Sequence, residues 1–341
     1  MNIVITGGAG FLGARLAQRL LALGRLSVAG RAAQAIETIT LVDRVAPQAE
    51  LAADARVRVM VGDLNQLLDR NSLEAQVIRA QDAIIFHMAA AVSGECEADF
   101  DLGMRSNLDA TRALLEQCRA VKTSPTVVFA SSLAVFGDSP EQPLPAVIDD
   151  RTLPTPQNSY GIQKFIGEQL VADYARKGFI RARNVRLMTV SVRPGKPNGA
   201  ASSFLSGMIR EPLAGLRAAC PVAPDTPVAL SSPSRTINGL LRAAEASDAD
   251  WGARTAINLP ALKTTPAQMA DALKKLAGRE VADLIDWRVD PVISKIVTSW
   301  PAVIDSGRAR ALGLLPDEDY ESIIAEYLSE SNLVKNRLAA Q

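Results

Sequence analysis

The chain has 341 residues, of which 37 are basic, 37 are acidic and 48% are hydrophobic. Its zero net charge excludes the basic field that a nucleic-acid or anionic-membrane binder needs. No apolar run reaches the roughly 18–20 residues that cross a bilayer. The first apolar run, over residues 3–5, lacks the basic segment that begins a secretory signal peptide. Three scattered cysteines exclude a disulfide scaffold and predict a cytoplasmic protein. One histidine excludes most histidine-based metal sites, and no metal is expected.

Short apolar, β-branched runs alternate with longer helical patterns through the first half of the chain. Strands are predicted over residues 2–6, 38–43, 56–61, 82–87, 126–130 and 185–192, and helices over 11–23, 107–119 and 160–177. Buried strands that alternate with helices indicate an α/β fold with a doubly wound parallel sheet of the Rossmann type.

Proline, glycine and serine become dense after residue 193, and a helix-then-strand pattern returns further along. We therefore assign residues 1–193 and 236–260 to a dinucleotide-binding domain. Residues 194–235 and 261–341 are expected to form a smaller substrate-binding region.

A glycine-rich turn joins the first strand to the first helix. Gly7, Gly10 and Gly13 allow a tight turn, close approach of the backbone to a pyrophosphate, and close helix–strand packing. The helix that begins with Phe11 and Leu12 would direct its free N–H groups at the phosphates. The alternative is a purely structural turn, but its place at the start of a strand–helix pair favours dinucleotide binding.

Asp43 ends the second predicted strand, where an acidic residue can accept hydrogen bonds from a ribose 2′-hydroxyl. A 2′-phosphate would meet this negative charge unfavourably, so NAD is expected as the cofactor. The adjacent Arg44 leaves NADP possible, and an insertion over residues 27–37 lengthens the usual spacing. A capping or surface role for Asp43 is the alternative.

The next two strand ends also face the expected cofactor site. Asp63 and Leu64 suit contacts with adenine, whereas Met88, Ala89 and Ala90 are positioned to let the chain pass close to the cofactor. His87 ends the same strand without a nearby nucleophile motif, so a packing role is favoured over a catalytic one.

A tyrosine and a lysine stand four residues apart at the start of a predicted helix. This spacing places Tyr160 and Lys164 on one helix face. A nearby ammonium can lower the pKa of a phenol by roughly 1–3 units, which makes it a base for an alcohol. Ser132 follows the fifth strand at the ligand-binding edge of the sheet and could hold the reacting oxygen. A chance helix-surface pair and a turn serine are the alternatives.

These motifs together resemble the extended short-chain dehydrogenase/reductases of the epimerase/dehydratase branch. The resemblance runs through residues 6–13, 63–64, 87–90, 106–107, 131–137, 160–164 and 193–195. It implies a triad of Ser132, Tyr160 and Lys164, with Lys164 also holding the nicotinamide ribose. It further implies that Pro194 contacts the cofactor and that Asn107 supports the active-site helix and a water relay to Lys164. For Asn107, a helix N-cap is the alternative.

The resemblance also bears on the reaction. Dehydratases of the family carry Thr-Asp-Glu where this chain has Ser132, Leu133 and Ala134, so the carboxylates for water loss are missing. Phe136 stands where the family often has tyrosine. Residues 187–198, 200–204, 209–215 and 231–235 resemble the branch that oxidises D-erythronate, a four-carbon sugar acid, at C2. That branch implies NAD-dependent oxidation of a short 2-hydroxy acid to its 2-keto acid.

A sugar-acid substrate needs a cationic or donor-rich pocket for its carboxylate. Arg235 is the first candidate because a guanidinium can bind a carboxylate bidentately, and Lys196 and Arg210 are others. Ser203 and Asn198 could serve the hydroxyl groups. Each of these side chains could instead be structural or solvent-exposed.

Two other functions and one assembly remain open at this point. A nucleotide-sugar epimerase would keep NAD tightly bound, and a non-catalytic dinucleotide sensor would use the same fold without turnover. Members of the family often pair as homodimers through the two helices predicted over 107–119 and 160–177. Leu108, Leu115, Ile166 and Leu170 lie on these helices and could alternatively face the sheet.

Overall fold

The computed structural model describes residues 1–69, 76–197 and 199–331. The chain divides into two compact units. The first unit comprises Met1–Val135, Asn158–Arg186 and Ile237–Ile257, and the second comprises Phe136–Gln157, Leu187–Thr236 and the residues from Asn258 onward.

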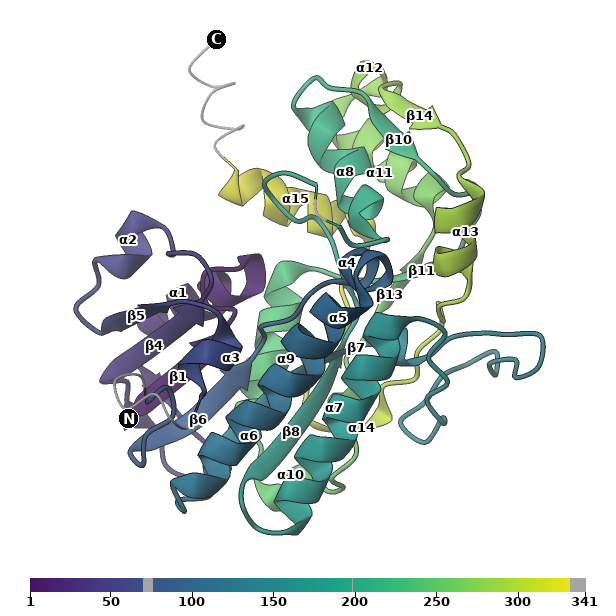
Figure 1. The fold of residues 1–341 in the computed structure, drawn as a ribbon. Helices are drawn as coiled ribbons and strands as arrows, with labels where there is room; N and C mark the ends of the chain where they lie inside the picture. The colour runs from purple at the N-terminus through teal and green to yellow at the C-terminus, as the bar shows by residue number, and fades with distance from the viewer. Residues whose placement is uncertain (70–75, 198, 332–341) are drawn as a thin grey trace. The chain divides into compact units, whose positions relative to one another are not determined.

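The first unit is built on a seven-stranded sheet with the order β12-β8-β7-β6-β1-β4-β5 (Figure 1). Strand β1 lies inside the sheet and pairs in parallel with β4 on one side and β6 on the other, so that Thr6 lies beside Val42 and His87. The chain order reverses at β1, and in such sheets ligands bind at the carboxyl edge beside this point. The predicted doubly wound α/β fold is thus confirmed. The strands are β1 Asn2–Thr6, β4 Thr38–Asp43, β5 Val57–Val61, β6 Asp82–His87, β7 Thr126–Ser132, β8 Arg181–Leu187 and β12 Ile257–Asn258.

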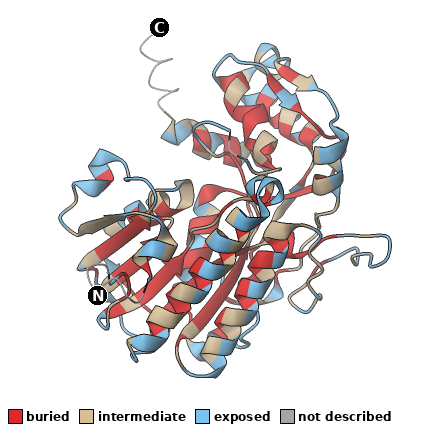
Figure 2. Ribbon diagram, viewed as in Figure 1, coloured by how far each residue is buried: buried red, intermediate tan, exposed pale blue. Residues whose placement is uncertain are grey.

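Helices flank this sheet, and α6 and α7 lie side by side on one face (Figure 1). Strands β1, β4, β6 and β7 of the sheet are almost entirely buried, whereas the edge strand β5 is partly exposed (Figure 2). The insertion predicted after the first helix forms a short hairpin of β2 Arg25–Leu26 and β3 Gln34–Ala35. The helices are α1 Phe11–Leu23, α2 Ala49–Ala52, α3 Leu64–Leu67, α4 Ser93–Ala98, α5 Phe100–Gly103, a π-helical segment Met104–Asp109, α6 Ala110–Ala120, a 3₁₀ turn Leu133–Val135, α7 Ser159–Arg176, α9 Pro233–Glu245 and α10 Asp248–Trp251.

The predicted strand over residues 185–192 is wrong in its bounds. Strand β8 begins at Arg181 and ends at Leu187, and the next two strand residues, Thr189 and Val190, pair with another sheet. The start of β8 was missed because its arginines read as solvent-exposed. Arg183 is buried, however, because its guanidinium donates to the carbonyl oxygens of Ala243 and Ala246 and to Asp248.

The second unit has its own apolar core, in which Leu205, Met208, Leu230 and Ile323 are buried (Figure 2). A three-stranded sheet and a two-stranded sheet are packed with helices from the same unit. Its elements are β9 Thr189–Val190, α8 Ser203–Leu213, β10 Ala218–Cys220, β11 Val228–Ser231, β13 Leu262–Thr264, α11 Pro266–Ala277, α12 Arg279–Ala282, β14 Ile285–Trp287, α13 Pro291–Thr298, α14 Gly307–Ala311 and α15 Tyr320–Glu330. In the described part of the chain, no helix combines the length and apolarity of a bilayer span.

The segment Phe136–Gln157 falls in the second unit, although it was assigned above to the dinucleotide-binding domain. Its backbone is hydrogen-bonded to the C-terminal part of the chain: Ile148 donates to the carbonyl of Val303 at 2.9 Å, and Asp305 donates to the carbonyl of Ile148 at 2.7 Å. Phe136, the departure from the family pattern, is fully buried. Because this segment has no long strand or helix pattern, its backbone partners could not be predicted from the sequence.

Candidate active site

The glycine turn after β1 is so closely packed that two of its glycines could not carry a side chain without a shift of the backbone. Gly7 has φ +71°, and a Cβ there would lie 2.8 Å from the amide nitrogen of Ala89. A Cβ on Gly13 would lie 2.0 Å from the carbonyl oxygen of Gly7. The N-cap of α1 is Gly10, so no side chain covers the first N–H groups of the helix. This cradle fits the pyrophosphate of a dinucleotide.

Asp43 lies at the rim of this cradle, at the end of β4. Its Oδ2 accepts a hydrogen bond from the amide of Ala9 at 3.0 Å, and its Oδ1 accepts one from the amide of Arg44 at 2.7 Å. The carboxylate is therefore held in place by the glycine turn itself. Each oxygen keeps a lone pair with which it could accept a ribose hydroxyl.

Asp63 and Leu64 lie at the start of the short helix α3, for which the sequence shows no helical pattern. Asp63 is exposed, and its side chain caps this helix by accepting from the amide of Asn65 at 2.9 Å. Contact with adenine stays a prediction for these two residues.

The loop after β6 is tied to the glycine turn through the single histidine. Thr111 donates its hydroxyl proton to the carbonyl of Asn107, so it must accept from His87 Nε2, which is 2.9 Å away. His87 Nδ1 then accepts from the hydroxyl of Thr6 at 2.7 Å. The oxygen of Thr6 accepts in turn from the amides of Met88 and Ala89. Burial lowers the pKa of His87 to about 3, so this ring is a neutral support, as the sequence analysis favoured.

Ser132, Tyr160 and Lys164 all belong to the first unit. Ser132 is the last residue of β7, and its Oγ accepts from the amide of Ala134 at 3.1 Å. Helix α7 begins beside Tyr160 because Asn158 caps it, its Oδ1 accepting from the amide of Gly161 at 2.8 Å.

Lys164 is buried one turn further along α7. Its Nζ donates to the carbonyl oxygen of Ala130 at 2.9 Å and lies 5.6 Å from the ring centroid of Tyr160. Burial lowers the pKa of Lys164 to about 8, and interactions with Cys96 and Glu168 oppose this shift. An ammonium held this close favours the charged form of the Tyr160 phenol.

Asn107 lies inside the π-helical segment, which rules out the alternative role as an N-cap. The helix already starts earlier in the chain, where Asp99 caps it by accepting from the amide of Leu102. The side chain of Asn107 instead accepts from the amide of Ala91 at 2.8 Å and donates to Gln163 Oε1 at 2.8 Å. It therefore connects the loop after β6 with α7, and the water relay to Lys164 stays a prediction. Gln163 was missed because nothing in its surroundings in the sequence marks it as buried.

The expected substrate residues other than Ser132 and Tyr160, together with Pro194 of the expected cofactor site, belong to the second unit. Lys196 and Pro194 are exposed, and Ser203 is the first residue of α8. The guanidinium of Arg235 is 39% exposed, and its Nε lies 3.9 Å from Asp317. Asn198 lies outside the described residues. Their contact with substrate or cofactor stays a prediction.

Arg210, the other cationic candidate, is committed to the protein interior. It is buried, and its guanidinium donates to the carbonyl of Arg193 at 2.7 Å and to Glu211 at 2.5 Å. This arrangement agrees with the structural alternative.

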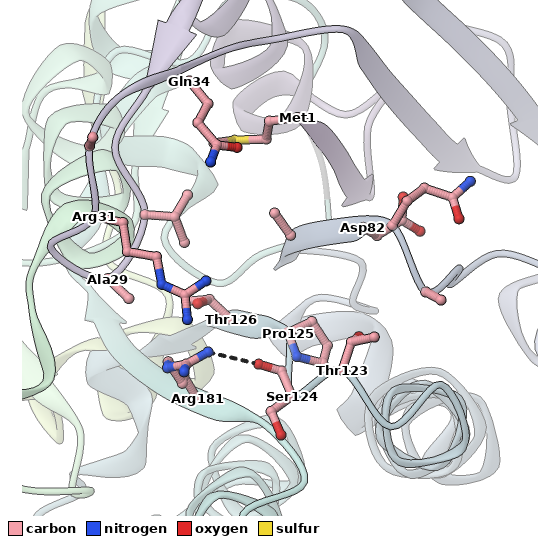
Figure 3. A pocket seen from close by; sticks show the side chains of 15 residues that line it. Met1, Ala29, Arg31, Gln34, Asp82, Thr123, Ser124, Pro125, Thr126 and Arg181 are labelled. Carbon is pink, nitrogen blue, oxygen red and sulfur yellow. Dashed lines mark hydrogen bonds between the residues drawn. The ribbon is translucent and has the colours of Figure 1, made fainter.

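The first unit also contains a cavity of about 230 Å³ (Figure 3), and none of the predicted site residues lines it. It is lined by Asp82, Thr126 and Arg181, which are the first residues of β6, β7 and β8. The glycine turn and Ser132 follow the carboxyl ends of their strands, so this cavity lies at the opposite edge of the sheet and is not the dinucleotide site.

Known proteins resemble this chain over nearly its full length. A model of the NAD-dependent epimerase/dehydratase family matches residues 3–226. The chain is 49% identical to D-erythronate dehydrogenase of Cupriavidus necator, over 98% of this chain and 100% of that protein. It is 40% identical to D-erythronate dehydrogenase of Haemophilus influenzae, over 96% and 99%. The crystal structure of the nucleoside-diphosphate-sugar epimerase from Agrobacterium tumefaciens is 37% identical, with a TM-score of 0.87 over 97% and 94% of the two chains. The chain belongs to the NAD-dependent epimerase/dehydratase family.

Proposed function

We propose that this protein is an NAD-dependent dehydrogenase that oxidises D-erythronate, or a closely related short 2-hydroxy sugar acid, at C2 to the 2-keto acid. The observation that carries the proposal is the buried Lys164 ammonium, 5.6 Å from the ring of Tyr160 on the same helix face. The two D-erythronate dehydrogenases that align over almost their whole length support the choice of substrate.

A bound nicotinamide would supply the hydride acceptor for the C2 hydrogen. Tyr160 would take the proton of the substrate hydroxyl, and Ser132 would hold the same oxygen as it becomes a carbonyl. Lys164 would stabilise the phenolate and bind the nicotinamide ribose. The remaining cofactor residues would be Gly7, Gly10 and Gly13 at the phosphates, with Phe11, Leu12, Asp43, Asp63, Leu64, Met88, Ala89, Ala90, Asn107 and Pro194 around them.

The position of Asp43 supports NAD over NADP. Its carboxylate is fixed beside the glycine turn, so a 2′-phosphate would lie close to a negative charge. The exposed Arg44 is the one neighbouring feature that favours NADP. Arg235 is the proposed partner of the substrate carboxylate, with Lys196, Asn198 and Ser203 as further substrate residues.

With D-erythronate we expect steady formation of NADH, and slower formation of NADPH when NADP replaces NAD. A panel of four- to six-carbon aldonates, read by the absorbance of the reduced cofactor, measures chain length and stereochemistry together. If no acid in the panel produces net NADH, the proposed reaction is wrong.

The epimerase from Agrobacterium tumefaciens makes a nucleotide-sugar epimerase the second candidate. An epimerase returns the hydride to the substrate, so it would release no reduced cofactor and would be purified with NAD bound. Conversion of a nucleoside-diphosphate sugar without net NADH would favour this function over the dehydrogenase.

We further propose a homodimer formed through α7 and the continuous helical stretch that runs from α5 through the π-helical segment into α6. Phe100, Ile162 and Ile166 are exposed there, and the last two are four residues apart on one face of α7. Leu115, by contrast, is fully buried in the core and cannot contribute.

Sedimentation of the wild-type protein should give the mass of a dimer, and Ile166→Glu should give that of a monomer. A charge buried in an apolar interface is costly, so the dissociation constant of the dimer should rise by at least about tenfold. Val292→Glu, at an exposed apolar residue of the second unit, is the control and should remain dimeric. A wild-type protein at monomer mass would end this proposal.

A further inference from the structure

A buried ion pair lies beneath the candidate catalytic side chains. Glu168 is on α7, four residues after Lys164 and eight after Tyr160, so the three side chains share one helix face. Its carboxylate is bound bidentately by Arg186 of β8, with Nε–Oε1 at 2.9 Å and Nη2–Oε2 at 2.8 Å. Both side chains are almost fully buried, at 2% and 5% exposure.

The same carboxylate reaches the end of β7. Ser131 Oγ donates to Glu168 Oε1 at 2.5 Å, and Ser131 directly precedes Ser132. The carbonyl of Ala130, one residue earlier, accepts from Lys164 Nζ at 2.9 Å. Two adjacent residues of β7 are thus bound to two residues of α7 that are one turn apart.

Stability alone is a weak reason for this arrangement. Taking two charges out of water is costly, and a well-packed apolar pair would stabilise the fold as well or better. The close fit of α7 on the sheet already comes from Gly167, where a Cβ would lie 2.6 Å from the ring of Phe129. We therefore look for the role of the ion pair in the side chains that it positions, and not in the stability of the fold.

We propose, on the basis of the function proposed above, that Glu168 is a positioning residue. With Arg186 and Ser131 it sets the depth of Lys164 and Ser132 at the sheet edge, and it keeps a negative charge one helical turn from the ammonium.

The groups that face Lys164 agree with this assignment. His87 of β6 is neutral, and burial raises the pKa of the Cys96 thiol of α4, so that thiol is also uncharged near neutrality. In the part of the chain that the structure describes, Glu168 is then the anion beside Lys164, and its interaction raises the pKa that burial has lowered to about 8. Without that charge, Lys164 should lose its proton at lower pH and stabilise the Tyr160 phenolate less.

The test is a titration of tyrosinate absorbance in the ligand-free protein. The chain has four tyrosines. Burial raises the pKa of Tyr174 to about 12 and also raises the pKa values of Tyr320 and Tyr327. The first tyrosine to ionise should therefore be Tyr160, and this step should be absent in Tyr160→Phe.

Glu168→Gln should move this first step to higher pH by about one unit, because the ammonium beside the phenol is lost earlier. It should also lower kcat by about 10–100-fold through misplacement of the reacting groups, with KM nearly unchanged. The control is Asp248→Asn, which removes another ion pair of β8, that of Arg183 with Asp248 at 2.8 Å. The control should leave the first step in place.

Because Glu168→Gln leaves Arg186 buried beside a neutral group, a second variant guards against unfolding. Glu168→Leu combined with Arg186→Met replaces the pair by apolar side chains, a change that is often neutral for stability. If this folded double variant keeps both the wild-type tyrosinate step and the wild-type kcat, the proposal is overturned. A different outcome would contradict only the proposed function. If Glu168→Gln shifts the first tyrosinate step but the wild-type protein oxidises no 2-hydroxy acid, the proposed function is wrong and the positioning role is supported.

Discussion

Tyr160→Phe should reduce the turnover of the sugar acid by about 10²–10⁴-fold, the range that a positioned general base contributes. The phenyl ring keeps the shape of the site but cannot take a proton. The dissociation constant of NAD should change little, because the glycine turn and Asp43 are untouched. Turnover measured by NADH formation, and NAD binding measured by calorimetry, separate the two effects.

Tyr174→Phe is the matched control. Tyr174 lies on the same helix, and its hydroxyl donates to Glu116, so this variant also removes one phenolic oxygen from α7. We expect turnover close to that of the wild type. If Tyr160→Phe retained comparable turnover, another group would have to be the base.

Gly13→Ala should weaken both the fold and cofactor binding. The new Cβ would lie 2.0 Å from the carbonyl oxygen of Gly7, so helix α1 and the turn must move apart. Overpacking of this kind costs about 1–3 kcal/mol. Because the displaced turn is also the phosphate cradle, a loss of the same order raises the NAD dissociation constant by about tenfold for each 1.4 kcal/mol.

Gly10→Ala separates packing from phosphate contact. Its Cβ would meet one atom within 4 Å, the carbonyl oxygen of Gly7 at 3.2 Å, and the backbone at Gly10 has φ −68°, which alanine adopts easily. Thermal melting of this variant should stay near that of the wild type. Equal melting of Gly13→Ala and wild type would show that the third glycine is not needed for close packing.

The carboxyl edge of the sheet could be predicted because it depends on local rules. Apolar strands end at residues that cannot continue them, and Gly7, Asp43 and Ser132 stand at such ends in the structure as they do in the sequence. The spacing of Tyr160 and Lys164 fixes one helix face whatever lies around it.

The partners of buried polar side chains could not be predicted, because they come from distant parts of the chain. Arg183 and Arg186 would be expected at the surface from the sequence alone. They are buried because Arg183 donates to the carbonyl of Ala243 on α9 and Arg186 pairs with Glu168 on α7. The sequence left an N-cap open as the alternative for Asn107, because its partners Ala91 and Gln163 lie 16 and 56 residues away in the chain. Substrate-binding residues are still harder to predict, because a guanidinium such as that of Arg210 can bind a backbone carbonyl oxygen as well as a substrate carboxylate.

His87 has a consequence for the behaviour of the protein in acid. Its ring is held neutral between Thr6 and Thr111, whereas an unfolded chain would take up a proton there below about pH 6.5. Below about pH 6.5 the unfolded state therefore binds a proton at His87, whereas the native state binds it only near pH 3. The free energy of unfolding falls as the pH drops between these two values. Acidification should therefore lower the stability of the fold that carries the cofactor cradle.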